Sequence, residues 1–166
     1  MQVNNTLNTN NTSFRNLTLT RDARVIVNKM TEPERKEFKK IAKSISDTMH
    51  WNLKLKADEL NKDRFSCSFV NKHNPKDIFP GGYWIYDINE NRVSIASLST
   101  KGKTRYEDLV FPNEERVEAM MDMDKKHTSA ILSNSTGGIL SRIKQLAEQI
   151  RFLDEAYEYK MKNNAL

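Results

Sequence analysis

The sequence predicts an α+β fold, in which the helices and the strands occupy separate stretches of the chain. Hydrophobic residues recur at helical spacing before about residue 50 and after about residue 112. Between about 51 and 98 they alternate with polar residues, as they do in half-buried strands. We therefore expect a four-stranded antiparallel meander sheet, flanked by two N-terminal helices and by a C-terminal antiparallel helical hairpin.

The first 13 residues differ in composition from the rest of the chain. They carry no charge and few apolar side chains, so burial cannot offset the entropy lost on ordering them. We expect a flexible polar tail at 1–13 and a single domain at 14–166. With no acidic residue before Asp22, the tail also suits an unfolded leader for bacterial type III secretion, but an ordinary polar terminus explains it more simply.

Two helices are predicted before residue 50. A first helix over about 20–30 has its apolar residues on one face. The second has a better-marked start, because Thr31 can cap it and Glu34 can complete a capping box. Pro33 lies in the first turn, where its missing N–H group has no cost. We expect this second helix to extend to about Thr48.

Four strands are predicted in the middle of the chain, at about 51–55, 65–69, 82–88 and 92–98. The last two flank a turn-prone segment at 89–91. Pairing Asp87 with Arg92 across this turn sets a register in which four apolar side chains share one face: Trp84, Tyr86, Val93 and Ile95.

The C-terminal part of the chain predicts two more helices. After an irregular basic stretch at 100–111, a helix is expected over about 113–134, with Glu114 and Glu115 at its positive end. The short break at 134–138 favours an antiparallel hairpin. The last helix has the clearest pattern in the sequence, an apolar seam spaced alternately by four and three residues: Ile139, Ile143, Leu146, Ile150, Leu153 and Tyr157.

This seam has two explanations. Isoleucine and leucine at alternating seam positions favour a parallel coiled coil, so one possibility is a homodimer through Ile139, Ile143, Leu146, Ile150 and Leu153. The flanking positions, Ala147 and Asp154 among them, offer no complementary ion pairs. Burial against the 113–134 helix or against the sheet explains the pattern within one chain, and we prefer that explanation.

Composition narrows the class of protein. No stretch approaches the roughly 20 apolar residues of a membrane span, and no secretory signal is recognisable at the N-terminus. The single cysteine, Cys67, excludes an intramolecular disulfide and indicates a reducing compartment. We therefore expect a cytoplasmic protein, of bacterial or phage origin by its Lys-, Asn- and Ile-leaning composition.

The sequence contains no clear catalytic or metal-binding motif. Cys67 and His127 could form a nucleophile and its base, oriented by Gln145 or Asp124. Yet Cys67 lies between two phenylalanines on an inward strand face, where a thiol behaves as a small hydrophobic group. We expect no cofactor and no metal, because the histidines are too scattered to indicate ligands: His50, His73 and His127.

Two surfaces could bind another macromolecule. One combines a lysine face of the second helix with the basic stretch after residue 100, and it could contact nucleic acid: Lys36, Lys39, Lys40, Lys43, Lys101, Lys103 and Arg105. The other lies on the long connection 71–82 and the strand that follows, and it could contact a protein: Ile78, Phe79, Trp84 and Tyr86. An ordinary solvated helix face and a loop pinned by its own buried side chain explain the same residues without a partner.

We therefore predict a non-enzymatic interaction protein that binds a protein partner through its helical surface or through the aromatic strand and loop. A secreted, effector-like protein is one class that this prediction includes. The alternatives are an enzyme that uses Cys67 or a histidine, and a nucleic-acid-binding regulator that uses the basic helix at 35–43.

Overall fold

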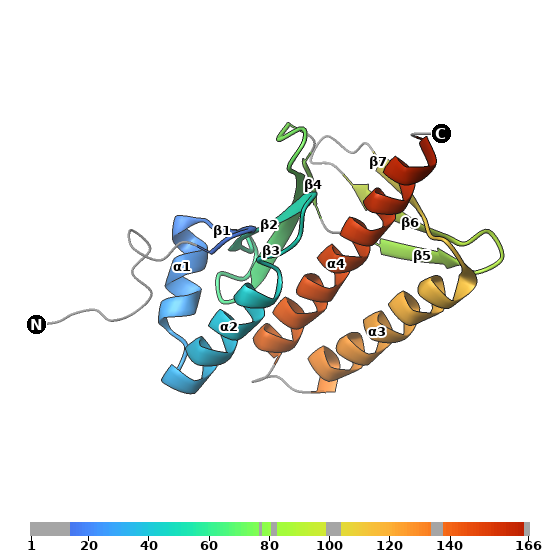
Figure 1. Ribbon diagram of the computed structural model, residues 1–166. Helices are drawn as coiled ribbons and strands as arrows, with labels where there is room; N and C mark the ends of the chain where they lie inside the picture. The colour runs from blue at the N-terminus through green and yellow to red at the C-terminus, as the bar shows by residue number, and fades with distance from the viewer. Residues whose placement is uncertain (1–13, 77, 81–82, 99–103, 134–137, 165–166) are drawn as a thin grey trace, which may run out of the picture.

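The computed structural model describes residues 14–76, 78–80, 83–98, 104–133 and 138–164, so the predicted tail at 1–13 lies outside the described residues. Figure 1 shows three helices side by side in front of two β-sheets, with α4 in the middle. The helices of this layer are α2 (Glu32–Ser44), α4 (Gly138–Asn164) and α3 (Glu114–Ser133). The α+β class predicted from the sequence is confirmed.

The strands form two sheets instead of one meander. Sheet A has the order β1-β2-β3-β4 and sheet B the order β5-β6-β7. Sheet A contains β1 (Leu17–Leu19), β2 (Trp51–Ala57), β3 (Phe65–Asn71) and β4 (Ile78–Pro80). Sheet B contains β5 (Tyr83–Asp87), β6 (Arg92–Leu98) and β7 (Thr104–Val110).

The predicted single four-stranded meander is therefore wrong. Its first two strands are β2 and β3, and its last two are β5 and β6, which pair with each other in a different sheet. Sheet A also contains β1, which runs parallel to β2, and β4. Each of these two strands has three residues, which are too few to show a period of two. Sheet B gains β7 from the stretch expected to be irregular, where charged residues conceal the alternation.

The N-terminal helices begin where the sequence predicts. After α1 (Arg21–Asn28), Thr31 caps α2, because its hydroxyl accepts from the backbone N–H of Glu34 at 3.3 Å. The Glu34 carboxylate in turn accepts from the backbone N–H of Thr31 at 2.9 Å, which completes the capping box. The helix ends at Ser44, before the predicted Thr48. The buried side-chain amide of Asn16 donates to the carbonyl oxygens of Ile45 and Thr48, at 2.8 Å each, and so holds the turn that follows the helix.

The hairpin of β5 and β6 has the predicted register. Asp87 pairs with Arg92, and their side chains lie 3.7 Å apart. Asn91 has a φ of 52°, a left-handed conformation that asparagine tolerates in turns. On the inner face, Trp84 pairs with Ile95 and Tyr86 with Val93, as the sequence predicts.

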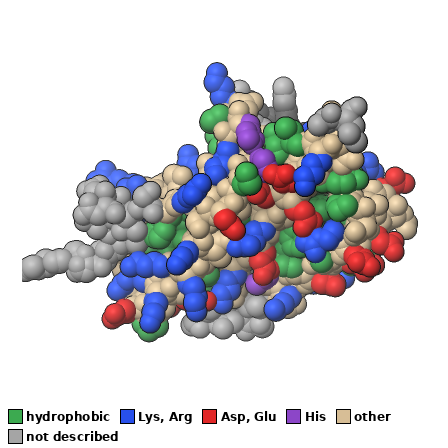
Figure 2. All heavy atoms as spheres, in the orientation of Figure 1, with side chains coloured by type: hydrophobic (Ala, Val, Ile, Leu, Met, Phe, Trp, Pro, Cys, Tyr) green, Lys and Arg blue, Asp and Glu red, His purple; other side chains and the backbone are tan. Residues whose placement is uncertain are grey.

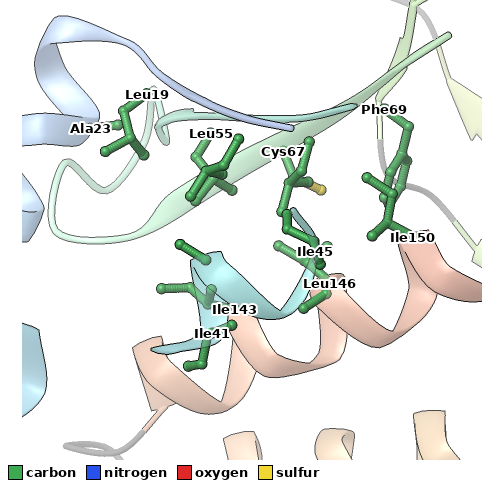
Figure 3. Close-up of a cluster of buried hydrophobic side chains, with 14 of the residues drawn as sticks. Leu19, Ala23, Ile41, Ile45, Leu55, Cys67, Phe69, Ile143, Leu146 and Ile150 are labelled. Carbon is green, nitrogen blue, oxygen red and sulfur yellow. The ribbon is translucent and has the colours of Figure 1, made fainter. Parts of the chain in front are cut away.

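The apolar seam of α4 is buried inside the chain. Four seam residues are at most 1% exposed: Ile143, Leu146, Ile150 and Leu153. Figure 3 shows Leu146 and Ile150 beneath Cys67 and Phe69 of sheet A, and beside Ile45 after α2. These seam side chains are not on the surface where a second copy could contact them.

Helices α3 and α4 form the predicted antiparallel hairpin. The guanidinium of Arg116 makes two hydrogen bonds to Glu155, at 2.9 and 2.7 Å, while His127 lies 2.9 Å from Glu148. Contacts from the start of α3 to its end thus reach successively earlier residues of α4, as they do between antiparallel helices. Among the described residues, no helix has both the length and the apolar character needed to cross a membrane.

Candidate functional site

Two histidines and a glutamate form a continuous chain of side-chain contacts beside α4. His50, just before β2, has its Nδ1 2.7 Å from Nε2 of His73, which follows β3. Its other ring nitrogen, Nε2, lies 2.6 Å from Oε1 of Glu158 on α4. Only 10% of the His50 side chain is exposed, whereas His73 is exposed and the Glu158 side chain is 41% exposed. We name this group, together with Tyr157, the histidine cluster.

The ring of Tyr157 lies against both imidazoles. His73 stacks on it with 5.3 Å between ring centroids and 8° between planes. His50 is 4.5 Å from it and tilted by 30°. Tyr157 and Glu158 are adjacent on α4. One turn of this helix therefore supplies both the ring that packs against the two imidazoles and the carboxylate that bonds to His50.

The backbone around His50 is fastened to the same helix. The carboxylate of Asp154 accepts from the backbone N–H groups of Met49, at 2.9 Å, and of His50, at 2.7 Å. On the other side, the ammonium of Lys72 donates to the carbonyl oxygen of Thr48 at 2.9 Å. These contacts hold the connection between α2 and β2 in place, and so they fix where the His50 ring points.

The hydrogen bonds of the histidine cluster restrict which of its nitrogen and oxygen atoms can carry a hydrogen. A hydrogen bond between two imidazole nitrogens needs one nitrogen with a hydrogen and one without. Glu158 is a carboxylate in this arrangement, because its hydrogen bond to His50 lowers the pKa of Glu158. The two ring nitrogens of His50 point in opposite directions, so His73 and Glu158 cannot bind one metal ion together with it. Across the part of the chain that the structure describes, no three His, Cys, Asp or Glu side chains are grouped to hold a metal.

Cys67 lies in the apolar core, and Figure 3 shows it between sheet A and the helices. Nη2 of Arg142 is 4.0 Å from its sulfur. The histidine suggested as its base, His127, lies at Glu148 instead. Cys67 and His127 therefore lie in two different environments, and the structure does not bring them together as a nucleophile and its base.

The other two residues of that hypothetical site, Gln145 and Asp124, do meet. The Gln145 side-chain amide donates to Asp124 at 2.6 Å, and Gln149 donates to the same carboxylate oxygen at 3.1 Å. Burial and the neighbouring Asp124 carboxylate raise the pKa of Tyr86, so its phenol stays protonated. The hydrogen bonds of Gln145 and Gln149 to Asp124 thus join α4 to α3.

The lysines of α2 form an exposed basic face. Lys36, Lys39, Lys40 and Lys43 are all exposed, and Figure 2 shows basic side chains gathered over this side of the molecule. Of the other residues proposed for a nucleic-acid surface, Lys101 and Lys103 lie outside the described residues. The side chain of Arg105 also lies outside them, so the structure does not bring these three to the lysine face.

A groove runs from this basic face across α4 toward α3, with a volume of about 420 Å³. Lys40, Ile41 and Ser44 line it from α2, and His127 lines it from α3. The remaining lining comes from one face of α4: Lys144, Ala147, Glu148 and Arg151. Its three lysine and arginine side chains thus come from two helices that are distant in sequence: Lys40 from α2, and Lys144 and Arg151 from α4. We name it the α2–α4 groove.

A second pocket, of about 480 Å³, lies between the two sheets and the C-terminal half of α4. Its aromatic lining comes from Trp51, Tyr157 and Tyr159, and Lys160 and Asp108 contribute charges. Tyr157 therefore belongs both to the histidine cluster and to the wall of this pocket.

The residues proposed for protein binding differ in exposure: Ile78 is exposed, whereas Trp84 and Tyr86 are half-buried. Ile78 is 44% exposed on β4. Trp84 packs edge-on against Phe69, with ring centroids 6.3 Å apart, and Tyr86 packs on the core between sheet B and α3. The side chain of Phe79 lies outside the described residues. Trp84 and Tyr86 thus hold sheet B onto the rest of the fold.

Sequence reasoning missed the histidine cluster, although a signal for it existed. His50 comes one residue before β2 and His73 two residues after β3, and these strands pair antiparallel with Trp51 opposite Asn71. The antiparallel pairing of the two predicted strands alone would have placed both histidines at the same end of the sheet. The histidines are far apart in the sequence, but distance along the chain does not measure their proximity in the fold.

Comparison with protein families, with curated proteins and with solved structures gave no match for this chain.

Proposed function

We propose that this protein is a non-enzymatic interaction protein that binds an acidic segment of a protein partner through the lysine face of α2 and the α2–α4 groove. The observation that carries the proposal is the charge on this face. Lys36, Lys39, Lys40 and Lys43 are exposed, and none of them makes an ion pair with another described residue. Unpaired charges of one sign on one helix face attract a partner of the opposite sign.

The cations on the far side of the groove are already paired. Lys144 lies 3.3 Å from Glu37, and Arg151 lies 3.8 Å from Asp47. Glu148 also lines the groove. Acidic groups interleaved with the lysines would repel the continuous phosphates of a nucleic acid, but a protein segment with a few carboxylates can avoid them. This pattern supports an acidic protein partner over a nucleic acid.

The groove supports a partner with apolar as well as acidic side chains. Ile41 and Ala147 contribute apolar lining between the charged rims. A volume of about 420 Å³ accommodates a few side chains, not a folded domain. The helical surface is a better candidate than the aromatic strand, because Trp84 and Tyr86 face the core.

The test measures binding of the full chain to two fluorescent probes over a range of salt concentrations. One probe is a peptide that alternates glutamate and leucine at helical spacing, and the other is a DNA duplex of the same charge. We expect the wild-type protein to bind the peptide more tightly. Substitution of the four α2 lysines by glutamine should weaken peptide binding by about tenfold or more.

A matched control separates the lysine face from net charge. Lys56, Lys62, Lys125 and Lys126 are exposed outside α2, and their replacement by glutamine removes the same charge. This variant should bind the peptide like the wild type. Equal losses in both variants would contradict the proposed site, and tighter binding of the duplex with a steep salt dependence would favour a nucleic-acid-binding protein instead.

A further inference from the structure

We propose that the histidine cluster is a proton-operated latch: it holds the segment 73–76 on α4 while His50 and His73 together carry at most one added proton, and releases it when both are protonated. The segment is part of the connection between β3 and the edge strand β4. This inference is independent of the proposed binding surface, which lies on α2.

The latch follows from the number of protons that the cluster can hold. At 2.7 Å, Nδ1 of His50 and Nε2 of His73 share one hydrogen between them. The neutral pair satisfies this contact, and so does the pair with one added proton, because His50 can then donate to both His73 and Glu158. With two added protons, both facing nitrogens carry hydrogens. The hydrogen bond is then lost and two cations face each other.

The second proton should displace His73 and leave His50 in place. His50 is nearly buried, its ring is bonded to Glu158, and its backbone N–H is held by Asp154. His73 is exposed, and its ring is held by His50 and by stacking on Tyr157. Its backbone N–H donates to the Asn71 side chain at 2.9 Å, a contact that does not depend on the ring. Departure of the His73 ring would uncover one side of Tyr157.

The charged groups that face the two histidines come from α4 and from the side of sheet A. Helix α4 contributes the carboxylates of Asp154 and Glu158 on the side of His50, and Lys162 acts on Glu158 from the next turn. From the side of sheet A, the ammonium of Lys72 lies at Thr48. Once His50 is cationic, its charge adds to that of Lys72, and the nearest carboxylate is already engaged. A second proton on the pair therefore removes the hydrogen bond and sets two cations against each other, and this operates the latch.

The experiment is a pH titration of the full chain from pH 8 to pH 5 by nuclear magnetic resonance. We expect the His73 ring, the Tyr157 ring and the backbone amides of His73, Asn74 and Lys76 to change together in one transition. Protection of the segment's amides against hydrogen exchange, corrected for the intrinsic rate, should fall by about tenfold across this transition.

Two variants distinguish the latch from general acid sensitivity. In His73→Gln the side-chain N–H can donate to Nδ1 of neutral His50, and the side-chain carbonyl oxygen can accept from Nδ1–H of protonated His50. The amide itself cannot take up a proton, so the segment should stay docked at pH 5. His127→Gln removes the other buried histidine, which lies at Glu148, and should leave the transition unchanged. The proposal is overturned if the wild-type segment and Tyr157 do not change down to pH 5, or if His73→Gln shows the same transition as the wild type.

Discussion

The inner face of α4 carries Ile143, Leu146 and Ile150, each at most 1% exposed, whereas its outer face carries the exposed Lys144 and Arg151. The inner face packs on sheet A and on α2 in a core built from many elements. Removal of one of its side chains therefore affects every element that contributes to this core. The outer face acts locally, through one polar contact at a time.

The outer face fastens one particular segment, the connection between α2 and β2. Arg151 contacts the backbone carbonyl of Ser44, Asp154 accepts from two backbone N–H groups, and Glu158 bonds to His50. These three residues are spaced by three and four, so they form a polar stripe along the helix. The comparison teaches that the apolar face decides where α4 lies and the polar stripe decides which loop is held against it. Three substitutions, in order of decreasing effect, test this difference.

The largest effect is expected from Leu146→Ala on the inner face. This change removes a fully buried side chain and leaves a cavity between α4 and sheet A, at a cost of about 2–5 kcal/mol in the free energy of unfolding. Chemical denaturation measures it. The matched control is Lys144→Ala on the outer face, which removes only an exposed ion pair and should cost at most about 1 kcal/mol. Equal losses for the two variants would refute the comparison.

An intermediate effect is expected from Gln145→Ala, at a buried polar position facing α3. Gln145 is 3% exposed, and it bonds to Asp124, to Thr128 and to Arg142. Its removal leaves these groups with fewer partners in the interior, which should cost about 1–3 kcal/mol in the free energy of unfolding. Glu118→Ala, at an exposed position of α3, is the control. A neutral Gln145→Ala would show that the interior network adds no stability.

The smallest effect is expected from Glu158→Gln, and it should depend on pH. The hydrogen bond to His50 lowers the pKa of Glu158 from its ordinary value of 4.5 in the folded state. A carboxylate with a lowered pKa stabilises the fold above its unfolded pKa, and this contribution disappears as the pH falls through the folded pKa. Denaturation of both proteins between pH 7 and pH 3 should show a wild-type advantage that is present above about pH 5 and lost toward pH 3. A constant difference over this range would contradict the assignment.

The local features of the fold could be predicted because short-range chemistry determines them. The Thr31 cap needs only a hydroxyl and a glutamate three residues apart, and the β5–β6 hairpin needs only a turn and the pairing of Asp87 with Arg92. The apolar seam of α4 was equally readable. Each of these features depends on residues close together in the sequence.

The division of the strands into two sheets could not be predicted, since it depends on contacts between distant segments. The strand Leu17–Leu19 is too short to establish a period of two, yet it pairs in parallel with β2. The sequence of β7 has too many charges to show its inward face, which packs where α4 and sheet B meet. Strand propensity does not determine which of several possible neighbours a strand takes.

The sequence by itself determined the helices, their capping, the hairpin and the burial of the seam, because spacing along the chain controls all four. The tertiary structure decided which face of α4 meets which element, and therefore what its polar stripe holds. It brought His50 and His73 together across 23 positions of the chain and set Glu158 and Tyr157 of α4 beside them. Antiparallel pairing of the two predicted strands places the histidines at one end of the sheet, but only the packing of α4 brings Glu158 and Tyr157 to them.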